Sequence, residues 1–276
     1  MIFLLWIFLP DCTTTIREKE TSSDLDKDDN VFVETKKRVT AEDIERQIQR
    51  VEYESYVAEY ADKDFLTGKV KRKEIRQLIK IDNEYTEREI YLIRPVYEAY
   101  KDMYKAALAD GVRLIITSGH RTFTEQVLEW ELRWNNPRTE TTFANDIEKA
   151  KFLLQYRAMP GTTRHHWGTD IDLNSFELAY YETKEGQKVY HWLKENAEKF
   201  GFFQPYTVYD KNRPVGYMEE KWHWSYKPLS QLMLSKFLRL VTINDIVGFK
   251  GDTAAKKLPV ISDWVCSINP QLKDEN

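Results

Sequence analysis

Histidine and carboxylate side chains that could share a metal ion lie in two short stretches of this sequence. Residues 163–172 read Thr-Arg-His-His-Trp-Gly-Thr-Asp-Ile-Asp, and residues 219–224 read Glu-Glu-Lys-Trp-His-Trp. A hydrolytic zinc site needs three nitrogen or oxygen ligands with one open position, and a separate carboxylate that accepts a proton. The two stretches offer candidates for all of these groups: His165, Asp172 and His223 as ligands, with Glu220 as the free base.

Three motifs follow one another along the chain. They are residues 118–126 (Ser-Gly-His-Arg-x-x-x-x-Gln), residues 163–172 (Thr-x-His-x-x-Gly-x-x-x-Asp) and residues 220–223 (Glu-Lys-Trp-His). Together they resemble the signatures of the zinc D-alanyl-D-alanine carboxypeptidases of the VanY type, peptidase family M15. The chain departs from that pattern at Thr163, where the family has Ser, and at Asp170, where the family has Ala. Thr163 keeps the hydroxyl group, whereas Asp170 adds a carboxylate beside the site.

The resemblance implies a Zn²⁺ site and a general base. His165, Asp172 and His223 would hold the ion. Glu220 would take a proton from the attacking water and later deliver it to the departing amine. In an ideal strand residues 220 and 223 face opposite sides, so this interpretation requires a turn or bulge before Trp222.

The resemblance also implies a set of groups that contact the substrate. Arg121 would anchor the terminal carboxylate or help to hold the developing oxyanion, because a guanidinium stays charged and binds carboxylates in a bidentate manner. Ser118, Gln126 and Thr163 would position the substrate. Asp170 is either an acceptor for the N–H of a ligand histidine or an ordinary loop acid, and the sequence leaves both readings open.

The function implied by the resemblance is zinc-dependent removal of the terminal D-alanine from the stem peptides of peptidoglycan. Two alternatives remain open: an L,D-carboxypeptidase or endopeptidase acting on the same stem, and a non-catalytic, zinc-stabilised module that binds the cell wall. A pure binding module has no need for a free carboxylate beside a ligand, so Glu220 and Arg121 favour an enzyme. We expect a monomer whose partner is the stem peptide.

Composition narrows the class of protein independently. The 276-residue chain has 41 Lys and Arg against 45 Asp and Glu, a net charge of −4, and a pI of about 5.9, which argues against nucleic-acid binding. Apolar residues make up 42% of the chain, too many for a disordered protein. The two cysteines, Cys12 and Cys266, exclude a disulfide scaffold and a cysteine-rich zinc finger.

The first residues favour export. Residues 2–9 are an unbroken apolar run, too short to span a bilayer but typical of a signal, and Cys12 follows closely. We therefore predict a lipoprotein-like signal over residues 1–12 and a flexible polar linker over residues 13–40. The protein would be periplasmic or on the cell surface, with lipid attached to Cys12.

Long helical patterns and short, separate strand patterns together favour an α+β fold. We expect a small antiparallel sheet flanked by helices, with the zinc site in a cleft on the sheet and helical extensions at both ends. The catalytic domain would cover residues 41–228, and a C-terminal helical extension residues 229–276. Helices are predicted from residue 41 and over 84–110 (kinked, or divided into two helices, at Pro95), 122–134, 147–156 and 184–200, and strands over 112–117, 171–173 and 222–226.

Overall fold

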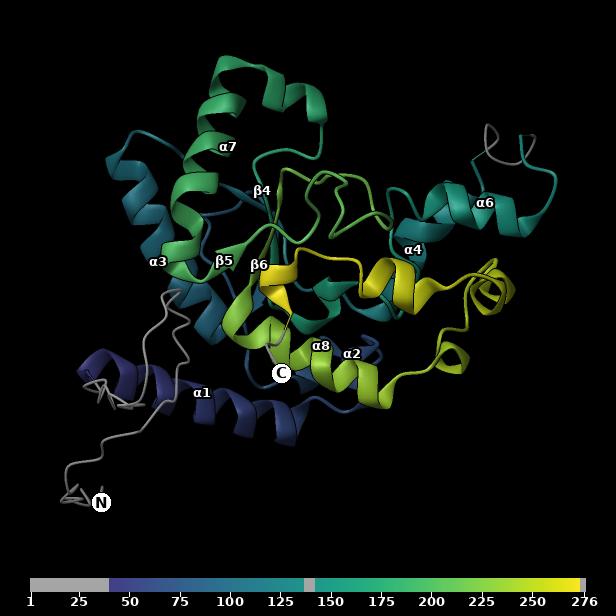
Figure 1. Ribbon diagram of the computed structural model, residues 1–276, viewed down its shortest axis with the longest axis horizontal. Helices are drawn as coiled ribbons and strands as arrows, with labels where there is room; N and C mark the ends of the chain where they lie inside the picture. Colours follow the sequence, from purple (N-terminus) through teal and green to yellow (C-terminus); the bar gives the residue numbers. More distant parts are fainter. Residues whose placement is uncertain (1–39, 137–141, 274–276) are drawn as a thin grey trace, which may run out of the picture. The chain divides into compact units, whose positions relative to one another are not determined.

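The computed structural model describes residues 40–136 and 142–273 (Figure 1). The predicted signal over residues 1–12, with Cys12, and the linker up to residue 39 lie outside the described residues. Within the described part of the chain, every helix is too short or too polar to pass through a lipid bilayer.

The chain divides between Glu52 and Tyr53 into two units, and helix α1 (Ala41–Tyr60) runs across this boundary. A capping box begins α1. The backbone N–H of Thr40 donates to Asp43 Oδ2 at 2.9 Å, and the backbone N–H of Asp43 donates to Thr40 Oγ1 at 3.1 Å. All other described elements belong to the unit that starts at Tyr53.

A four-stranded antiparallel sheet carries the candidate ligands. Its strand order is β3-β4-β6-β5, and the strands are β3 (Ile116–Ser118), β4 (Asp170–Leu173), β6 (His223–Tyr226) and β5 (Phe202–Phe203). Asp172 pairs with Ser118 on one side and with His223 on the other. The register therefore places parts of all three sequence motifs at one level of the sheet.

A second, two-stranded antiparallel sheet consists of β1 (Leu78–Lys80) and β2 (Tyr91–Ile93). It packs behind the turn that follows the first ligand, because Ile93 N donates to Gly168 O at 3.2 Å. With the four-stranded sheet and the surrounding helices, it gives the α+β architecture that the sequence predicts.

Helices surround the four-stranded sheet. They are α2 (Lys63–Leu66), α3 (Arg94–Ala109), α4 (Phe123–Trp134), α6 (Asp146–Leu153), α7 (Lys184–Asn196) and α8 (Lys227–Leu240). In Figure 1, α3 and α7 lie together on one flank of the strands, where Trp192 Nε1 donates to Asp110 Oδ2 at 2.7 Å. Helices α4 and α6 lie on the other flank.

Two predicted boundaries are wrong. The helix expected over residues 84–110 begins only at Arg94, because Pro95 occupies its first turn instead of kinking its interior. Residues 91–93 before it are strand β2. The strand expected over residues 112–117 is reduced to Ile116–Ser118, since Ile115 N donates to a side-chain oxygen of Asn174 and not to a neighbouring strand.

The C-terminal residues belong to the same core as the sheet. Leu229, Met233 and Phe237 of α8 are fully buried, and the Phe237 ring lies 6.0 Å from that of Trp167. After α8 the chain makes only short helical turns, shorter than the mostly helical tail that the sequence suggests. The short helical turns of the described chain are η1 (Arg72–Glu74), η2 (Arg164–Trp167), η3 (Leu178–Glu182), η4 (Ala197–Phe200), η5 (Ile243–Asp245), η6 (Asp252–Lys257), η7 (Ile261–Val265) and η8 (Pro270–Leu272).

Candidate metal centre

Three buried side chains from three elements converge at the centre of the four-stranded sheet. Asp172 and His223 are directly paired residues of β4 and β6, so their side chains leave the sheet on the same face. His165 comes from η2, and Gly168, with a φ of +68°, returns the chain from η2 into β4. The three residues are at most 3% exposed.

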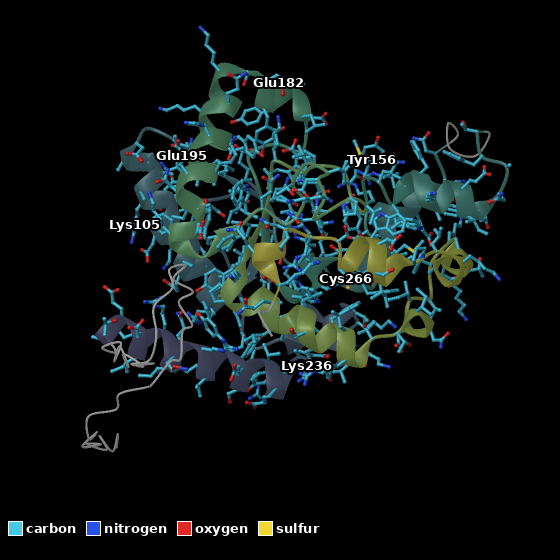
Figure 2. The ribbon with its side chains drawn as sticks, in the orientation of Figure 1. Lys105, Tyr156, Glu182, Glu195, Lys236 and Cys266 are labelled. Atoms are coloured by element: carbon cyan, nitrogen blue, oxygen red, sulfur yellow. The ribbon has the colours of Figure 1, made fainter. Side chains whose placement is uncertain are left out.

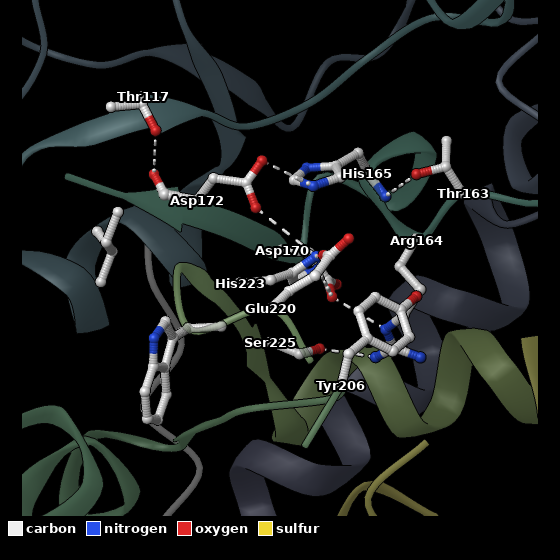
Figure 3. Close-up of polar contacts among 12 residues, drawn as sticks. Thr117, Thr163, Arg164, His165, Asp170, Asp172, Tyr206, Glu220, His223 and Ser225 are labelled. Carbon is white, nitrogen blue, oxygen red and sulfur yellow. Dashed lines mark hydrogen bonds and ion pairs between the residues drawn. The ribbon is translucent and has the colours of Figure 1, made fainter. Parts of the chain in front are cut away.

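The distances among these side chains suit a shared cation. His165 Nε2 lies 3.2 Å from Asp172 Oδ2, and His223 Nδ1 lies 3.6 Å from Asp172 Oδ1 (Figure 3). One ligand atom from each residue lies within 4.8 Å of the other two. Asp172 Oδ1 is buried and has no hydrogen-bond partner within the described chain. A buried carboxylate oxygen without a donor is what a metal-binding site is expected to contain.

The second nitrogen of each histidine is held by an acceptor. His165 Nδ1 lies 2.8 Å from the carbonyl oxygen of Gly119, which leaves Nε2 to face the centre. His223 Nε2 lies 3.0 Å from Asp170 Oδ1, which leaves Nδ1 to face the centre. Of the two readings of Asp170 that the sequence left open, the structure supports the acceptor for a ligand histidine.

Asp170 is itself fixed by neighbouring groups. Arg164 Nε donates to Asp170 Oδ1 at 2.9 Å, and Thr169 Oγ1 donates to Asp170 Oδ2 at 2.6 Å. The guanidinium of Arg164 also donates to Ser225 Oγ at 2.6 Å (Figure 3). Arg164 and Asp170 are both fully buried, so this ion pair is enclosed behind the candidate ligands.

Glu220 faces the same centre because the chain turns just before β6. Glu220 N donates to Tyr206 O at 3.0 Å, and His223 N donates back to Glu220 O at 3.3 Å. This is the turn that the sequence interpretation requires, and it brings Glu220 Oε2 to 2.9 Å from His223 Nδ1. The neighbouring acid, Glu219, instead accepts a hydrogen bond from Tyr190 at 3.0 Å.

The charges of these groups favour a cation. Burial opposes ionisation of Asp172, but the interactions with His165 hold the pKa of its carboxyl well below the usual range. Burial, together with the nearby Arg121 guanidinium, lowers the pKa of His165 and keeps its ring neutral. For His223, burial disfavours the charged ring, but hydrogen bonds with Asp170 and Glu220 raise the pKa to about 9. The free site therefore binds a proton at His223, which a metal ion displaces.

The other motif residues are only partly brought together. Arg121 Nη2 lies 3.3 Å from Asp172 Oδ2, and Arg121 Nη1 donates to Gln126 Oε1 at 3.0 Å. Thr163 lines the cavity, and its Oγ1 accepts the backbone N–H of His165 at 3.3 Å. Ser118 pairs with Asp172 in the sheet, but its side chain is not among those that line the cavity.

The cavity has further walls that the sequence motifs do not include. Its lining also contains Tyr156, Arg157, Tyr206 and Tyr217, beside Trp222 of the third motif. The Tyr206 ring meets the His223 ring edge-on at 5.0 Å. The four residues outside the motifs lie in connecting segments of the structure, and nothing in the sequence marks them as cavity residues.

The family model of VanY, described as D-alanyl-D-alanine carboxypeptidase, matches residues 89–229, about half of the chain. The chain belongs to this family. The match includes the candidate ligands, Glu220 and Arg121, and it confirms the resemblance on which the sequence interpretation rests.

Two curated proteins are similar to this VanY-family chain. The D-alanyl-D-alanine carboxypeptidase of Enterococcus faecalis is 32% identical over 128 residues, which cover 46% of this chain and 44% of that protein. The putative carboxypeptidase YodJ of Bacillus subtilis is 30% identical over 147 residues, which cover 49% of this chain and 46% of that protein. The chain thus spans less than half the length of each of these two relatives.

Solved structures of VanY-type proteins are also similar. A complex of VanYB with D-alanine-D-alanine is 25% identical, with a TM-score of 0.47, over 62% of this chain and 86% of that chain. A vancomycin-resistance D,D-pentapeptidase VanY mutant in complex with Zn(II) is 24% identical, with a TM-score of 0.45, over 64% and 88% of the two chains.

Proposed function

We propose that this protein is a zinc-dependent carboxypeptidase that removes the terminal D-alanine from peptidoglycan stem peptides. The observation that carries the proposal is the set of three buried candidate ligands with a fourth group, Glu220, whose carboxylate is 2.9 Å from His223 Nδ1. Three protein ligands and a separate carboxylate are the composition of a catalytic zinc site, since a structural site uses four ligands. Membership of the VanY family supports the substrate.

His165, Asp172 and His223 would hold the zinc ion through Nε2, a carboxylate oxygen and Nδ1. This nitrogen and oxygen donor set suits zinc better than calcium or magnesium, which prefer oxygen ligands alone. When bound, zinc supplies a Lewis acid for the attacking water and for the carbonyl of the scissile bond.

The chain's own residues move the proton and hold the charge. Glu220 is the general base: its carboxylate takes a proton from the attacking water and delivers it to the leaving amine. Arg121 supplies a fixed positive charge beside Asp172, where negative charge develops during attack. Asp170 and the carbonyl of Gly119 keep the two ligand imidazoles in their orientations.

The proposal is tested by incubating the purified protein, with and without a chelator, with a muramyl pentapeptide and a muramyl tetrapeptide. Mass spectrometry should detect loss of D-alanine from the pentapeptide, and both the chelator and Glu220→Gln should abolish it. Glu219→Gln is the matched control, because it removes an adjacent carboxylate that binds Tyr190 and should retain activity. Turnover that survives chelation and Glu220→Gln would overturn the mechanism, and turnover of the tetrapeptide alone would indicate an L,D-carboxypeptidase.

We further propose that the protein acts outside the cytoplasm. Support comes from the apolar run of residues 2–9 followed by Cys12, and from the family's cell-wall substrate. In this proposal residues 1–11 are removed, Cys12 becomes the lipidated N-terminus, and residues 13–40 are the linker to the catalytic domain. Fractionation of cells that express the full chain should find it in the membrane fraction, and Cys12→Ala should release it from there.

A further inference from the structure

A carboxypeptidase must recognise the free carboxylate at the end of its substrate, which requires a cation with unused hydrogen-bond donors. Two guanidinium groups line the cavity of the candidate metal centre, those of Arg121 and Arg157. Arg121 is already engaged within the protein: its Nη2 lies 3.3 Å from Asp172, and its Nη1 donates to Gln126 at 3.0 Å. Both Nη atoms of Arg121 therefore have partners within the protein before any substrate arrives, although its buried Nε has no hydrogen-bond partner.

Arg157 has fewer partners within the protein than Arg121. In the described part of the chain it forms no ion pair, and its buried Nε has no hydrogen-bond partner. A guanidinium group carries five N–H donors, and a buried donor without an acceptor is energetically costly. An uncompensated arginine in the wall of a catalytic cavity indicates a place for an anionic group of a ligand.

The backbone around Arg157 is fixed next to the other cation. The segment lies between α6 and η2, directly after Tyr156, which Figure 2 labels. Arg157 N donates to Leu153 O at 2.9 Å, and Gln126 Nε2 donates to Ala158 O at 2.8 Å. Gln126 thus connects the Arg121 guanidinium to the residue that follows Arg157.

The charged surroundings of Arg157 leave it available for a ligand. Glu129 is the acid that interacts electrostatically with Arg157, but its carboxylate accepts a hydrogen bond from Arg133 Nη1 at 2.9 Å. Arg133 repels Arg157 as well. Arg121 and Arg157 therefore put two positive charges on this side of the cavity, and the nearby Glu129 is already paired with Arg133.

We propose that Arg157 binds the C-terminal carboxylate of the substrate, which leaves Arg121 to hold Asp172 and to face the scissile carbonyl. This inference rests on the proposed function. It divides between two residues the roles that the sequence interpretation offered to Arg121 alone, and it makes Arg157 the residue that selects peptides with a free C-terminus.

The test compares two forms of one D-alanyl-D-alanine peptide, the free acid and the C-terminal amide, as substrates. We expect the wild type to prefer the acid, and Arg157→Gln to raise KM for the acid about tenfold to a hundredfold while KM for the amide changes little. Arg157→Lys keeps the charge and should recover part of the preference. Lys151→Gln, which removes an exposed charge on α6, is the matched control and should behave as the wild type.

A binding measurement separates recognition from turnover. In a Glu220→Gln background, calorimetric titration with the free acid should detect binding that is lost when Arg157→Gln is added. If the variants of Arg157 discriminate acid from amide as well as the wild type does, this inference is wrong although the proposed function stands. If the wild type releases no D-alanine from either form, the proposed function itself fails, and this inference fails with it.

Discussion

Residue 170 is an aspartate where the VanY-type signature has alanine, and its contacts make it an acceptor for His223. Asp170 accepts from Arg164 and Thr169 and lies 3.0 Å from His223 Nε2. The carboxyl group of Asp170 stays ionised although burial opposes ionisation, because Arg164 and His223 lower its pKa. A charged acceptor behind a metal-binding imidazole fixes its orientation and makes it a better electron donor.

Asp170→Asn should weaken metal affinity about tenfold to a hundredfold, because His223 loses its charged acceptor. Arg164 also loses its counter-charge, so the fold is destabilised and the affinity must be measured on protein with a wild-type circular dichroism spectrum. Competition with a chelating dye gives the dissociation constant. Asp102→Asn, which removes an exposed acid of α3, is the control. An unchanged dissociation constant in Asp170→Asn would refute the role of Asp170.

At the scale of elements, the turn between η2 and β4 determines where His165 lies. Gly168 has a φ of +68°, a conformation that costs other residues about 1 kcal/mol or more. A Cβ atom there would lie 3.0 Å from Ile93 Cγ1 and 3.1 Å from Leu78 Cδ2, side chains of the two-stranded sheet. Gly168 thus has a left-handed backbone conformation and close neighbours, and it lies between His165 and Asp172 in the sequence.

Gly168→Ala should reduce both the free energy of unfolding, by about 1–2 kcal/mol, and the affinity for metal, because His165 is displaced relative to Asp172. Gly111→Ala is a matched control. Gly111 has the same φ of +68°, and an added Cβ meets only the end of the Lys188 side chain at 3.2 Å. Urea denaturation should detect a loss in both variants, whereas metal titration should detect a change only in Gly168→Ala. Equal metal affinity in the two variants would contradict this account.

Local signals explain which elements the sequence predicts well. The capping residues Thr40 and Thr122 mark the starts of α1 and α4, and Asp172 lies on a strand as expected. The predicted start of α3 is too early, because the apolar residues of β2 extend the helical pattern toward the N-terminus. Arg157 is beyond sequence reasoning for a different reason. Its proposed function depends on the absence of a partner in a cavity that distant segments form. The periodicity of a sequence does not indicate such an absence.

For the whole molecule, two buried histidines contribute to the way stability responds to acid. Burial lowers the pKa of His120 and of His166 to about 3. Both rings are held as neutral groups: His120 Nδ1 accepts from Arg72 Nε at 3.4 Å, and His166 Nε2 accepts from Gly161 N at 3.1 Å. The folded protein therefore cannot take up the protons that these side chains bind near pH 6.5 in the unfolded chain.

The free energy of unfolding should fall as the pH is lowered from about 6.5, because the unfolded chain then binds more protons than the folded one. Each histidine contributes about 1.4 kcal/mol per pH unit, so about 2 kcal/mol is lost per ring by pH 5. His120→Gln keeps an acceptor for Arg72. The variant should lose less unfolding free energy on acidification, by the amount that one histidine contributes. Urea denaturation at pH 7 and pH 5 measures it, and an unchanged slope in His120→Gln would show that His120 does not contribute.

The candidate ligands also connect metal binding to the stability of the whole molecule, because η2, β4 and β6 each supply one of them. Without a cation, the carboxylates of Asp170, Asp172 and Glu220 surround the His223 ring, and a proton on that ring takes the place of the metal ion. A ligand that binds only the folded state stabilises it by about 4 kcal/mol at a concentration of 1,000 times its dissociation constant.

Added zinc should therefore raise the midpoint of thermal unfolding, and a chelator should return it to the metal-free value. His165→Ala should abolish the zinc-dependent rise, because it removes the ligand that β4 and β6 cannot replace. His191→Ala is the matched control: His191 is 70% exposed and paired with Glu195 on α7, so its loss should leave the rise intact. A rise of equal size in His165→Ala would mean that zinc stabilises the protein at some other place, and the convergence of the three ligands would then have no thermodynamic consequence.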